Sequence, residues 1–445
     1  MGNTSFILAS IGVFLVVILL LVIILLVAKK YLSPSGNVNI VINGDKTINV
    51  PQGSSLMTTL NENGIFLPSA CGGKASCGQC KVQVLEGGGD ILPTEVNFFT
   101  RRQQVEKWRL GCQVKVKEDM KIKVPEAVLG VRKWECEVVS NRNVATFIKE
   151  FVVKLPEGEH LKFRSGGYIQ IDIPKYDEIR FRDFDVEPEY REDWDHMKMW
   201  DLVTKNPEPT FRAYSMANHP AEGNIIMLNI RIATPPWDRT AGAFMKVNPG
   251  ICSSYIFSRK PGDKVTISGP YGEFFVKDTP NEKMFVGGGA GMAPMRSHIF
   301  HLFKTEKIRT PVTFWYGARS KREIFYEEQF EEIEKEFPNF KFHIALSEPK
   351  EEDNWKGYVG FIHQVIFDNY LKNHEAPEDI EYYLCGPPMM TAARPITIAP
   401  RPIFTSALPE YCATRAPERP TKPFPSARPT TLALFVLIPC ALAIS

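Results

Sequence analysis

The pattern of apolar and polar residues begins with an unbroken apolar run from Phe6 to Ala28, which contains no charged side chain. A run of this length can cross a bilayer as a helix. Lys29 and Lys30 follow directly, and basic residues mark the cytoplasmic end of such a span. A cleaved signal peptide fits less well, because no basic residue precedes the run and no small-residue cleavage site follows it. The pattern therefore predicts a membrane anchor in residues 1–30, with the remaining chain in the cytoplasm.

After the anchor, short alternating runs predict a small region of mixed strands and helices. Residues 38–50 predict two strands joined at Asn43-Gly44, a dipeptide that favours the tight turn of a β-hairpin. Residues 54–64 predict a short helix with a serine at its start and a glycine at its end. Residues 81–87 alternate as a strand, and together these signals indicate an α+β domain.

The rest of the chain indicates two further domains, as its length of 445 residues requires, because one hydrophobic core cannot serve so long a chain. From about 130 to 270, short strand-like runs separated by turns predict an antiparallel barrel, interrupted by a polar, aromatic-rich insertion at about 176–209. From 273 to 390, four apolar strand-like runs predict an α/β domain. The net charge is only +2, so composition gives no reason to expect nucleic-acid binding.

The nine cysteines are unevenly placed, with three of them inside ten residues. Cytoplasmic thiols stay reduced, so clustered cysteines there are more often metal ligands or catalytic groups than disulfides. Zinc modules usually present two close pairs, whereas three close cysteines with a distant fourth are typical of a [2Fe–2S] site. Glycines between the cysteines allow the backbone to approach the sulfides closely. The predicted cluster ligands are Cys71, Cys77, Cys80 and Cys112.

Two polar motifs lie in the predicted barrel. In "RAYS", Arg212 and Tyr214 share one face of a strand while Ser215 points to the other. In "GICSSYIF", residues 250–257, two serines stand beside a glycine at a possible helix start, which is a natural anion site. Taken alone, an arginine and a tyrosine on one strand face are more often surface than a cofactor site.

A glycine loop opens the last domain, in "KMFVGGGAGMAPMRSHIF". An apolar strand runs into this loop and a helix begins near Pro294, so a helix N-terminus and bare backbone N–H groups are available to a phosphate. The loop departs from the strict G-x-G-x-x-G pattern. Ligands of such sheets bind beyond the carboxyl ends of the strands, which is where Tyr316, Ser347 and Cys385 fall.

These motifs carry two family resemblances. Residues 33–127 resemble a ferredoxin of the C-x5-C type, and the barrel motifs and glycine loop, in this order, are similar to the ferredoxin–NADP reductase superfamily. The fold class is therefore multidomain: an N-terminal transmembrane helix, an α+β β-grasp [2Fe–2S] ferredoxin, an antiparallel β-barrel FAD domain and an α/β Rossmann-like NAD domain. An atypical tail follows in residues 391–445.

The reductase resemblance implies roles for individual residues. Tyr214 would lie against the flavin ring, Ser215 would hydrogen-bond near the flavin N5, and Arg212, Ser253 and Ser254 would hold the pyrophosphate. Ser215 and Cys385 are the implied catalytic residues. The other implied FAD contacts are Gly250 and Cys252. The implied NADH contacts are Gly287, Gly288, Gly289, Gly291, Met292, Pro294, Tyr316, Ser347, Glu348, Cys385, Gly386 and Pro387.

One acidic residue favours NADH over NADPH. NADP-type relatives place an arginine after the serine that matches Ser347, whereas this chain has Glu348. A 2′-phosphate calls for a basic partner, so an acid at this position favours NADH. Arg319, Lys321 and Arg322 lie nearby and keep NADPH as the alternative.

With the anchor and the insertion, the chain as far as about Met390 closely resembles the F subunits of the Na⁺-translocating NADH:ubiquinone oxidoreductases. The resemblance implies electron transfer from NADH through FAD and the [2Fe–2S] cluster to other membrane subunits at the cell inner membrane, where quinone is reduced in those partners. Hydride carries two electrons and the cluster takes one, so a flavin between them is required. The three soluble modules alone also fit the reductase component of a multicomponent monooxygenase.

Residues 391–445 depart from this family. They are dense in proline and contain neither glycine nor aspartate, which excludes the helix that the family has there and favours irregular or extended chain. One interpretation is a shifted reading frame, and another is a lineage-specific tail. A second functional hypothesis follows, in which the chain is a membrane-anchored electron-transfer or assembly module whose reductase half is impaired.

Overall fold

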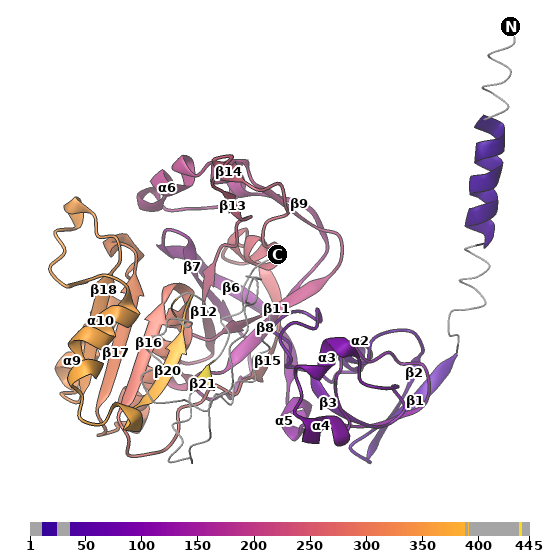
Figure 1. Ribbon diagram of the computed structural model, residues 1–445, viewed down its shortest axis with the longest axis horizontal. Coiled ribbons are helices and arrows are strands. Elements are labelled where there is room, and N and C mark those ends of the chain that lie inside the picture. The colour runs from indigo at the N-terminus through magenta and orange to yellow at the C-terminus, as the bar shows by residue number, and fades with distance from the viewer. Residues whose placement is uncertain (1–10, 25–35, 388–389, 391–435, 438–445) are drawn as a thin grey trace, which may run out of the picture. The chain divides into compact units, whose positions relative to one another are not determined.

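The computed structural model describes residues 11–24, 36–387, 390 and 436–437 (Figure 1). They separate into two compact units, one extending to Leu129 and the other from Gly130 onward, with Ser69–Gly72 grouped with the second. Residues 11–24, within the predicted anchor, are helical and have exposed side chains. In the described part of the chain, no helix combines the length and the apolar character needed to span a bilayer.

The first unit is built on a five-stranded sheet. Its strands are β1 (Asn37–Ile42), β2 (Lys46–Pro51), β3 (Lys81–Glu86), β4 (Trp108–Leu110) and β5 (Met120–Lys123). They lie in the order β2-β1-β5-β3-β4, with β1 and β5 parallel and the other neighbours antiparallel. Asn43 and Gly44 both take positive φ between β1 and β2, as the tight turn requires. The predicted hairpin is therefore confirmed.

Four short helices accompany this sheet: α2 (Leu56–Glu62), α3 (Pro93–Val96), α4 (Arg101–Val105) and α5 (Glu126–Leu129). The Oγ of Ser55 accepts the backbone N–H of Thr58, which confirms the predicted serine start of α2. Leu56 and Leu60 of α2 are completely buried, as are Ile40 of β1 and Val82 of β3, so this helix packs on the sheet and closes the core of the unit.

The second unit begins with six antiparallel strands. They are β6 (Arg132–Ala145), β7 (Ile148–Lys154), β8 (Tyr168–Ile173), β11 (Thr210–Ser215), β12 (Ile225–Arg231) and β15 (Lys264–Tyr271). Their order is β11-β8-β15-β6-β7-β12. The chain just after β11 meets β12 through a bridge between Met216 and Leu228 and a 2.7 Å hydrogen bond from Ala217 N to Met227 O. This contact closes the sheet into the predicted barrel.

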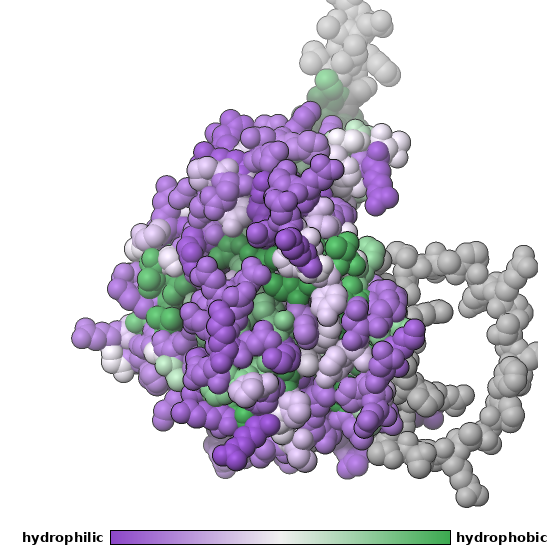
Figure 2. Space-filling view, turned by 90° about the vertical axis from the view of Figure 1, so that its left-hand side faces the viewer, coloured by the Kyte–Doolittle hydropathy of each residue, from purple (hydrophilic) through white to green (hydrophobic). Residues whose placement is uncertain are grey.

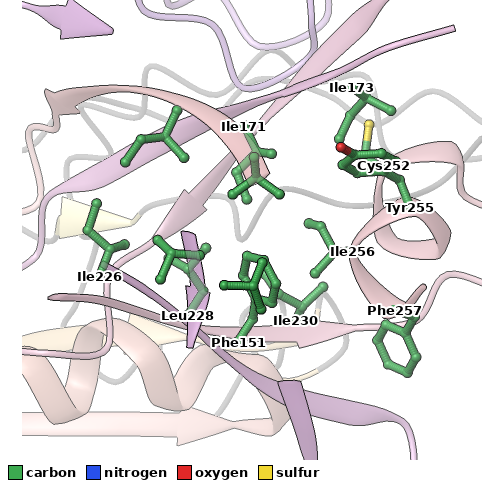
Figure 3. Close-up of a cluster of buried hydrophobic side chains, with 14 of the residues drawn as sticks. Phe151, Ile171, Ile173, Ile226, Leu228, Ile230, Cys252, Tyr255, Ile256 and Phe257 are labelled. Atoms are coloured by element: carbon green, nitrogen blue, oxygen red, sulfur yellow. The ribbon is translucent and has the colours of Figure 1, made fainter. Parts of the chain in front are cut away.

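The barrel encloses an apolar core that is covered at one end by helix α7 (Ile251–Phe257). Figure 3 shows Cys252, Tyr255 and Ile256 of α7 beside the isoleucines and leucine of β8 and β12. Ile171 and Ile256 are both completely buried. The helix that carries the two predicted serines is thus held in place by the core of the barrel.

The insertion forms β9 (Tyr176–Arg180), α6 (Arg191–His196) and β10 (Val203–Asn206), with β9 and β10 paired antiparallel. Trp194 of α6 is completely buried, and its Nε1 donates to the Thr146 carbonyl at 2.8 Å. The rings of Phe181 and Phe184 surround it. The insertion therefore packs on the barrel through its aromatic residues. A two-stranded hairpin, β13 (Trp237–Asp238) and β14 (Ala243–Phe244), follows β12.

The last domain is a parallel sheet. Its strands are β16 (Lys283–Gly288), β17 (Val312–Ala318), β18 (Phe340–Leu346), β19 (Tyr358–Val359), β20 (Glu381–Cys385) and β21 (Val436–Leu437). They lie in the order β19-β18-β17-β16-β20-β21, which confirms the α/β prediction. Apart from the two residues of β21, the predicted tail from residue 391 lies outside the described residues.

Helices cover both faces of this sheet: α8 (Met292–Phe300), α9 (Glu327–Glu336) and α10 (Ile362–Asn369). Ile299 of α8 and Phe330 of α9 share a core with Phe314, whereas Ile366 of α10 packs with Trp315 on the other face. Figure 2, which faces the side of the molecule that carries α9 and α10, shows a mainly hydrophilic surface with hydrophobic residues gathered in a band across its middle.

Candidate functional site

The predicted cluster loop lies between α2 and β3. Cys80 and Cys112 are 1% and 7% exposed, whereas Cys71 and Cys77 are partly exposed. A hydrogen bond with Cys112, together with burial, raises the pKa of the Cys80 thiol far above its ordinary value, and the nearby charge of Cys77 adds to this effect. A Cβ placed on Gly73 would lie 3.9 Å from the Cβ of Cys112. The loop thus brings Cys77 and Cys80 to the fourth cysteine.

The donor set fits a [2Fe–2S] cluster. None of the four cysteines takes part in a disulfide in the described structure, and Gly72, Gly73 and Gly78 all have positive φ, which glycine adopts without steric cost. Within the described residues, no three His, Cys, Asp or Glu side chains are drawn together tightly enough to hold a metal ion. The assignment of all four ligands therefore stays a prediction.

A buried ion pair lies close in sequence to the fourth cysteine. The Glu95 carboxylate is completely buried and lies 2.7 Å from Nη2 of Arg109, which is itself 4% exposed. Glu95 also accepts the backbone N–H groups of Leu92 at 3.0 Å and Leu110 at 2.7 Å. The pair thus ties α3 to β4 two residues before Cys112. Nothing in the sequence pattern indicates either residue.

The predicted flavin motif occupies β11, as expected. Arg212 and Tyr214 alternate with buried Ala213, so both side chains lie on one face of the strand. Burial, with a contribution from nearby Cys252, raises the pKa of Tyr214 well above its ordinary value. Its hydroxyl therefore stays protonated at neutral pH. Tyr214 and Cys252, predicted from separate motifs, are brought together.

The serines on α7 differ in what their hydroxyls contact. Ser253 Oγ donates to the Gly250 carbonyl at 3.1 Å and accepts the Ala233 N–H at 3.1 Å, so it fastens the start of the helix to the barrel. Ser254 Oγ is buried and has no hydrogen-bond partner among the described residues. A buried hydroxyl without a partner is costly, which fits a hydrogen bond from Ser254 to a bound phosphate.

The glycine loop makes a single 3₁₀ turn, Gly289–Gly291, between β16 and α8. A Cβ on Gly291 would lie 2.0 Å from the Cys385 carbonyl oxygen and 2.8 Å from the Gly386 nitrogen. The loop therefore packs directly on the end of β20, and only a glycine allows this approach. Met292 and Pro294 are buried in the first turn of α8. Two segments predicted separately as nucleotide contacts meet here.

Replacing Gly291 by alanine tests this contact. We expect the free energy of unfolding of the domain to fall by about 1–3 kcal/mol and the KM for NADH to rise about tenfold, because the loop must move away from β20. Urea unfolding and steady-state kinetics measure both. Gly289→Ala is the control, since its Cβ would have no neighbour closer than 3.9 Å and only positive φ opposes it. A smaller effect of Gly291→Ala than of Gly289→Ala contradicts the steric argument.

Tyr316, Ser347 and Glu348 lie at the carboxyl ends of β17 and β18. Tyr316 is completely buried, and its hydroxyl donates to the Gly289 carbonyl at 3.4 Å, so this hydrogen bond links the end of β17 to the glycine loop. Ser347 N donates to the Ala318 carbonyl. The exposed Glu348 carboxylate pairs with Arg319 Nε at 2.8 Å.

His298 and His301 follow the glycine loop, and the contacts of both are with neighbouring protein side chains. His298 is 1% exposed, and burial lowers its pKa to about 3, so it stays neutral beside the ring of Phe274. His301 lies in the π-helical turn that follows α8 and pairs with Glu306 at 3.1 Å. Neither belongs to a group of three possible metal ligands in the described chain.

Buried polar contacts join the barrel to the nucleotide-binding domain. Arg296 of α8 is 3% exposed, and its Nη2 lies 2.6 Å from Glu222 Oε1 while its Nη1 donates to the Ala217 carbonyl at 2.9 Å. Ser297 Oγ donates to the Asn218 carbonyl at 2.8 Å. We refer to these contacts as the interdomain clasp. They follow "RAYS" and the glycine loop directly, but neither motif pattern indicates them.

Tyr326 and Thr146 add further contacts to the interdomain clasp. Tyr326 OH donates to Glu150 Oε2 at 2.6 Å and accepts Asn229 Nδ2 at 2.8 Å. Thr146 donates its hydroxyl to Glu323, whose pKa is raised by burial although this hydrogen bond opposes the shift. The two domains are therefore fixed to one another by several buried polar groups.

Comparison with known protein families gives three domains. Residues 40–117 match the family described as a 2Fe-2S iron-sulfur cluster binding domain, residues 196–276 an oxidoreductase FAD-binding domain, and residues 285–394 an oxidoreductase NAD-binding domain. Together with the β-grasp sheet, the barrel and the parallel sheet, these matches define an iron–sulfur flavoprotein oxidoreductase that uses FAD and NAD.

Individual relatives narrow this class. The chain is 60% identical over 366 residues to the F subunit of the Na(+)-translocating NADH-quinone reductase of Methylococcus capsulatus, across 82% of this chain and 89% of that relative. It is 57% identical to the corresponding protein of Neisseria meningitidis, across 86% and 93%, and 56% identical to that of Pseudomonas aeruginosa, across 87% and 93%. The chain belongs to the family of F subunits of the Na(+)-translocating NADH-quinone reductases.

A solved structure supports the fold. The cytochrome P450 reductase GcoB of Amycolatopsis aligns with a TM-score of 0.55 at 20% identity, covering 81% of this chain and 94% of that one. At this identity the likeness concerns the order and folds of the domains alone.

Proposed function

We propose that this protein oxidises NADH at a bound FAD and passes the electrons through its [2Fe–2S] cluster to partner subunits of a Na(+)-translocating NADH-quinone reductase. The observation that carries the proposal is the presence of all three cofactor domains in one chain that is 56–60% identical to relatives of that name. The three domains alone would also fit a monooxygenase reductase, and these relatives favour the quinone reductase.

The proposal includes membrane attachment. Residues 1–30 would form a single-pass anchor in the cell inner membrane, with the domains at 33–127, 130–270 and 273–390 on the cytoplasmic side. Support comes from the uncharged apolar run and from the two lysines that follow it. Quinone would be reduced only in the partner subunits, to which this chain supplies electrons.

The chain's own residues position the reactants. FAD, when bound, accepts the hydride of NADH and delivers electrons one at a time to an acceptor such as the cluster. Tyr214 offers its ring, and Arg212 its cation, on one face of β11, and Ser215 ends the strand as a hydroxyl donor. The glycine loop, held against β20 at Gly291, offers backbone N–H groups to the phosphates of the nucleotide.

The preference for NADH rests on how the nearby cations are engaged. Arg319 pairs with Glu348, and Arg322 lies 3.3 Å from Glu192 and Asp193 of the insertion, so both cations already have acidic partners. The 2′-phosphate of NADPH, placed beside Glu348, would be repelled by the Glu348 carboxylate. It would also have to compete with this carboxylate for the guanidinium of Arg319, so both effects disfavour NADPH.

Replacing Glu348 by glutamine tests this preference. We expect kcat/KM for NADPH to rise about two- to fivefold, the scale of one exposed charge pair, because Arg319 is released and the carboxylate is removed. Steady-state kinetics with both nucleotides measure the ratio. Glu352→Gln is the matched control, since this glutamate pairs only with Lys350 in the described structure. An unchanged NADPH/NADH ratio in Glu348→Gln contradicts the assignment.

The proposed function is tested by adding NADH without oxygen to the purified full chain while recording its visible spectrum. Bleaching of both the flavin and the iron–sulfur bands supports electron flow along the whole path. A cluster that is reduced by dithionite but not by NADH supports the second hypothesis instead, in which the reductase half is impaired.

A further inference from the structure

The residue after the last predicted cluster ligand contacts that ligand's sulfur. Gln113 Nε2 donates toward Cys112 Sγ at 3.9 Å, within the longer range that hydrogen bonds to sulfur have. Gln113 is only partly buried, but its backbone N–H is fixed in a turn by the Leu110 carbonyl at 2.8 Å. The side chain therefore starts from a defined backbone position beside the sulfur.

A threonine contacts the other end of the Gln113 amide. Thr94 Oγ1 donates to Gln113 Oε1 at 3.2 Å. A hydroxyl can donate or accept, whereas a ligand sulfur only accepts, so the sulfur of Cys112 requires the NH₂ end of the amide and Thr94 supports this orientation by donating to the amide oxygen. The orientation is thus set by hydrogen-bond chemistry.

Thr94 itself is held by the buried ion pair. It precedes Glu95 on α3, and Glu95 is bound to Arg109 and to the N–H of Leu110. The same two residues of β4 lead into Cys112. Gln113 therefore bridges two segments whose separation is fixed by a completely buried carboxylate.

We infer that Gln113 raises the reduction potential of the iron–sulfur cluster by donating a hydrogen bond to the ligand sulfur of Cys112, with Thr94 holding the amide in the donating orientation. Reduction adds one negative charge to the cluster and its thiolates. A donor at a ligand sulfur stabilises that charge and so favours the reduced form. The inference rests on Cys112 being a ligand, as the proposed function holds, and makes Gln113 a positioning and tuning residue.

The test is an EPR-monitored redox titration of the full chain with dithionite. In Gln113→Leu, we expect the equilibrium constant for one-electron reduction to fall between about threefold and tenfold, a tenfold change being about 59 mV. Gln113→Glu should shift it further in the same direction, because a carboxylate only accepts and adds negative charge. Thr94→Val should give a smaller shift of the same sign. Gln83→Leu is the matched control, since Gln83 Nε2 donates to a backbone carbonyl, that of Glu106, at 2.8 Å.

Resonance Raman spectra give an independent measurement. Exchange into D₂O should move the iron–thiolate stretching bands of the natural protein, and part of that movement should vanish in Gln113→Leu but remain in Gln83→Leu. A loosened fold would not produce this difference. Unchanged potential and unchanged isotope response in Gln113→Leu overturn the inference.

Other outcomes remain decisive. If Gln113→Leu does not hold the cluster, unchanged potentials in both Gln113→Glu and Thr94→Val overturn the inference. A native cluster spectrum in Cys112→Ser removes its basis, because Cys112 would then be no ligand. Because dithionite replaces NADH, a failure of the chain to oxidise NADH counts against the proposed function and leaves the shift in potential measurable.

Discussion

Replacing Cys112 by serine is expected to remove the cluster and to stop electron transfer beyond the flavin, while hydride transfer from NADH continues. Serine oxygen is a poor substitute for a thiolate, and Cys112 lies 7% exposed against Cys80, so no other described cysteine can take its place without moving the loop. We expect quinone reduction in the assembled complex to fall by more than about a hundredfold, which exceeds the loss expected from changing a residue that only hydrogen-bonds to a cluster ligand.

The two activities are measured on one preparation. Ferricyanide takes electrons directly from reduced flavin, so its rate with NADH should stay within about twofold, while the iron–sulfur absorption disappears. Cys136→Ser is the control, because Cys136 is completely buried in the barrel and burial raises the pKa of its thiol to about 12. Loss of ferricyanide reduction in Cys112→Ser, or a retained cluster, contradicts the predicted electron path.

Replacing Glu95 by alanine should produce the largest loss of stability in the first unit. It would leave the guanidinium of Arg109 buried without its carboxylate, and it would also remove the acceptor of two backbone N–H groups. Breaking a buried ion pair from one side costs about 3–5 kcal/mol. Urea unfolding of the full chain, followed by the visible absorption of the cluster, should show a correspondingly earlier loss of the cluster.

An exposed pair in the same domain provides the comparison. Glu106 pairs with Arg102 at 2.8 Å across one helical turn, with 38% and 88% of their side chains exposed. Glu106→Ala should therefore change the unfolding midpoint little, because water already screens this pair. A loss of stability in Glu95→Ala no greater than in Glu106→Ala would show that the buried pair contributes no more than the exposed one. Adding Arg109→Leu to Glu95→Ala should recover part of the loss.

Local signals explain which elements could be predicted from the sequence. The hairpin at Asn43-Gly44, the helix that starts after Ser55 and the strand β3 each depend on residues adjacent in the chain, whose turn and capping chemistry is readable. The glycine loop could be predicted for the same reason. Its contact with Cys385 could not be predicted, because a parallel sheet brings together segments almost a hundred residues apart.

The insertion shows a different limit. Its sequence combines aromatic and charged residues, and this composition does not tell which of the aromatic side chains will be completely buried. The structure buries Trp194 and Phe181 completely, with the charges on the outer side. The ion pair of Arg296 and Glu222 could not be predicted either. Charged residues are usually exposed, and the sequence does not show which of them will be buried against a partner of opposite charge.

The interdomain clasp has a consequence for how nucleotides come and go. Opening the barrel from the nucleotide-binding domain would separate Arg296 from Glu222 and break the hydrogen bonds of Ser297 and Tyr326 in the same step. A hinge motion between the two domains would therefore have to break these contacts together. The interdomain clasp therefore opposes any change in the spacing between the barrel and the nucleotide-binding domain while nucleotides bind and leave.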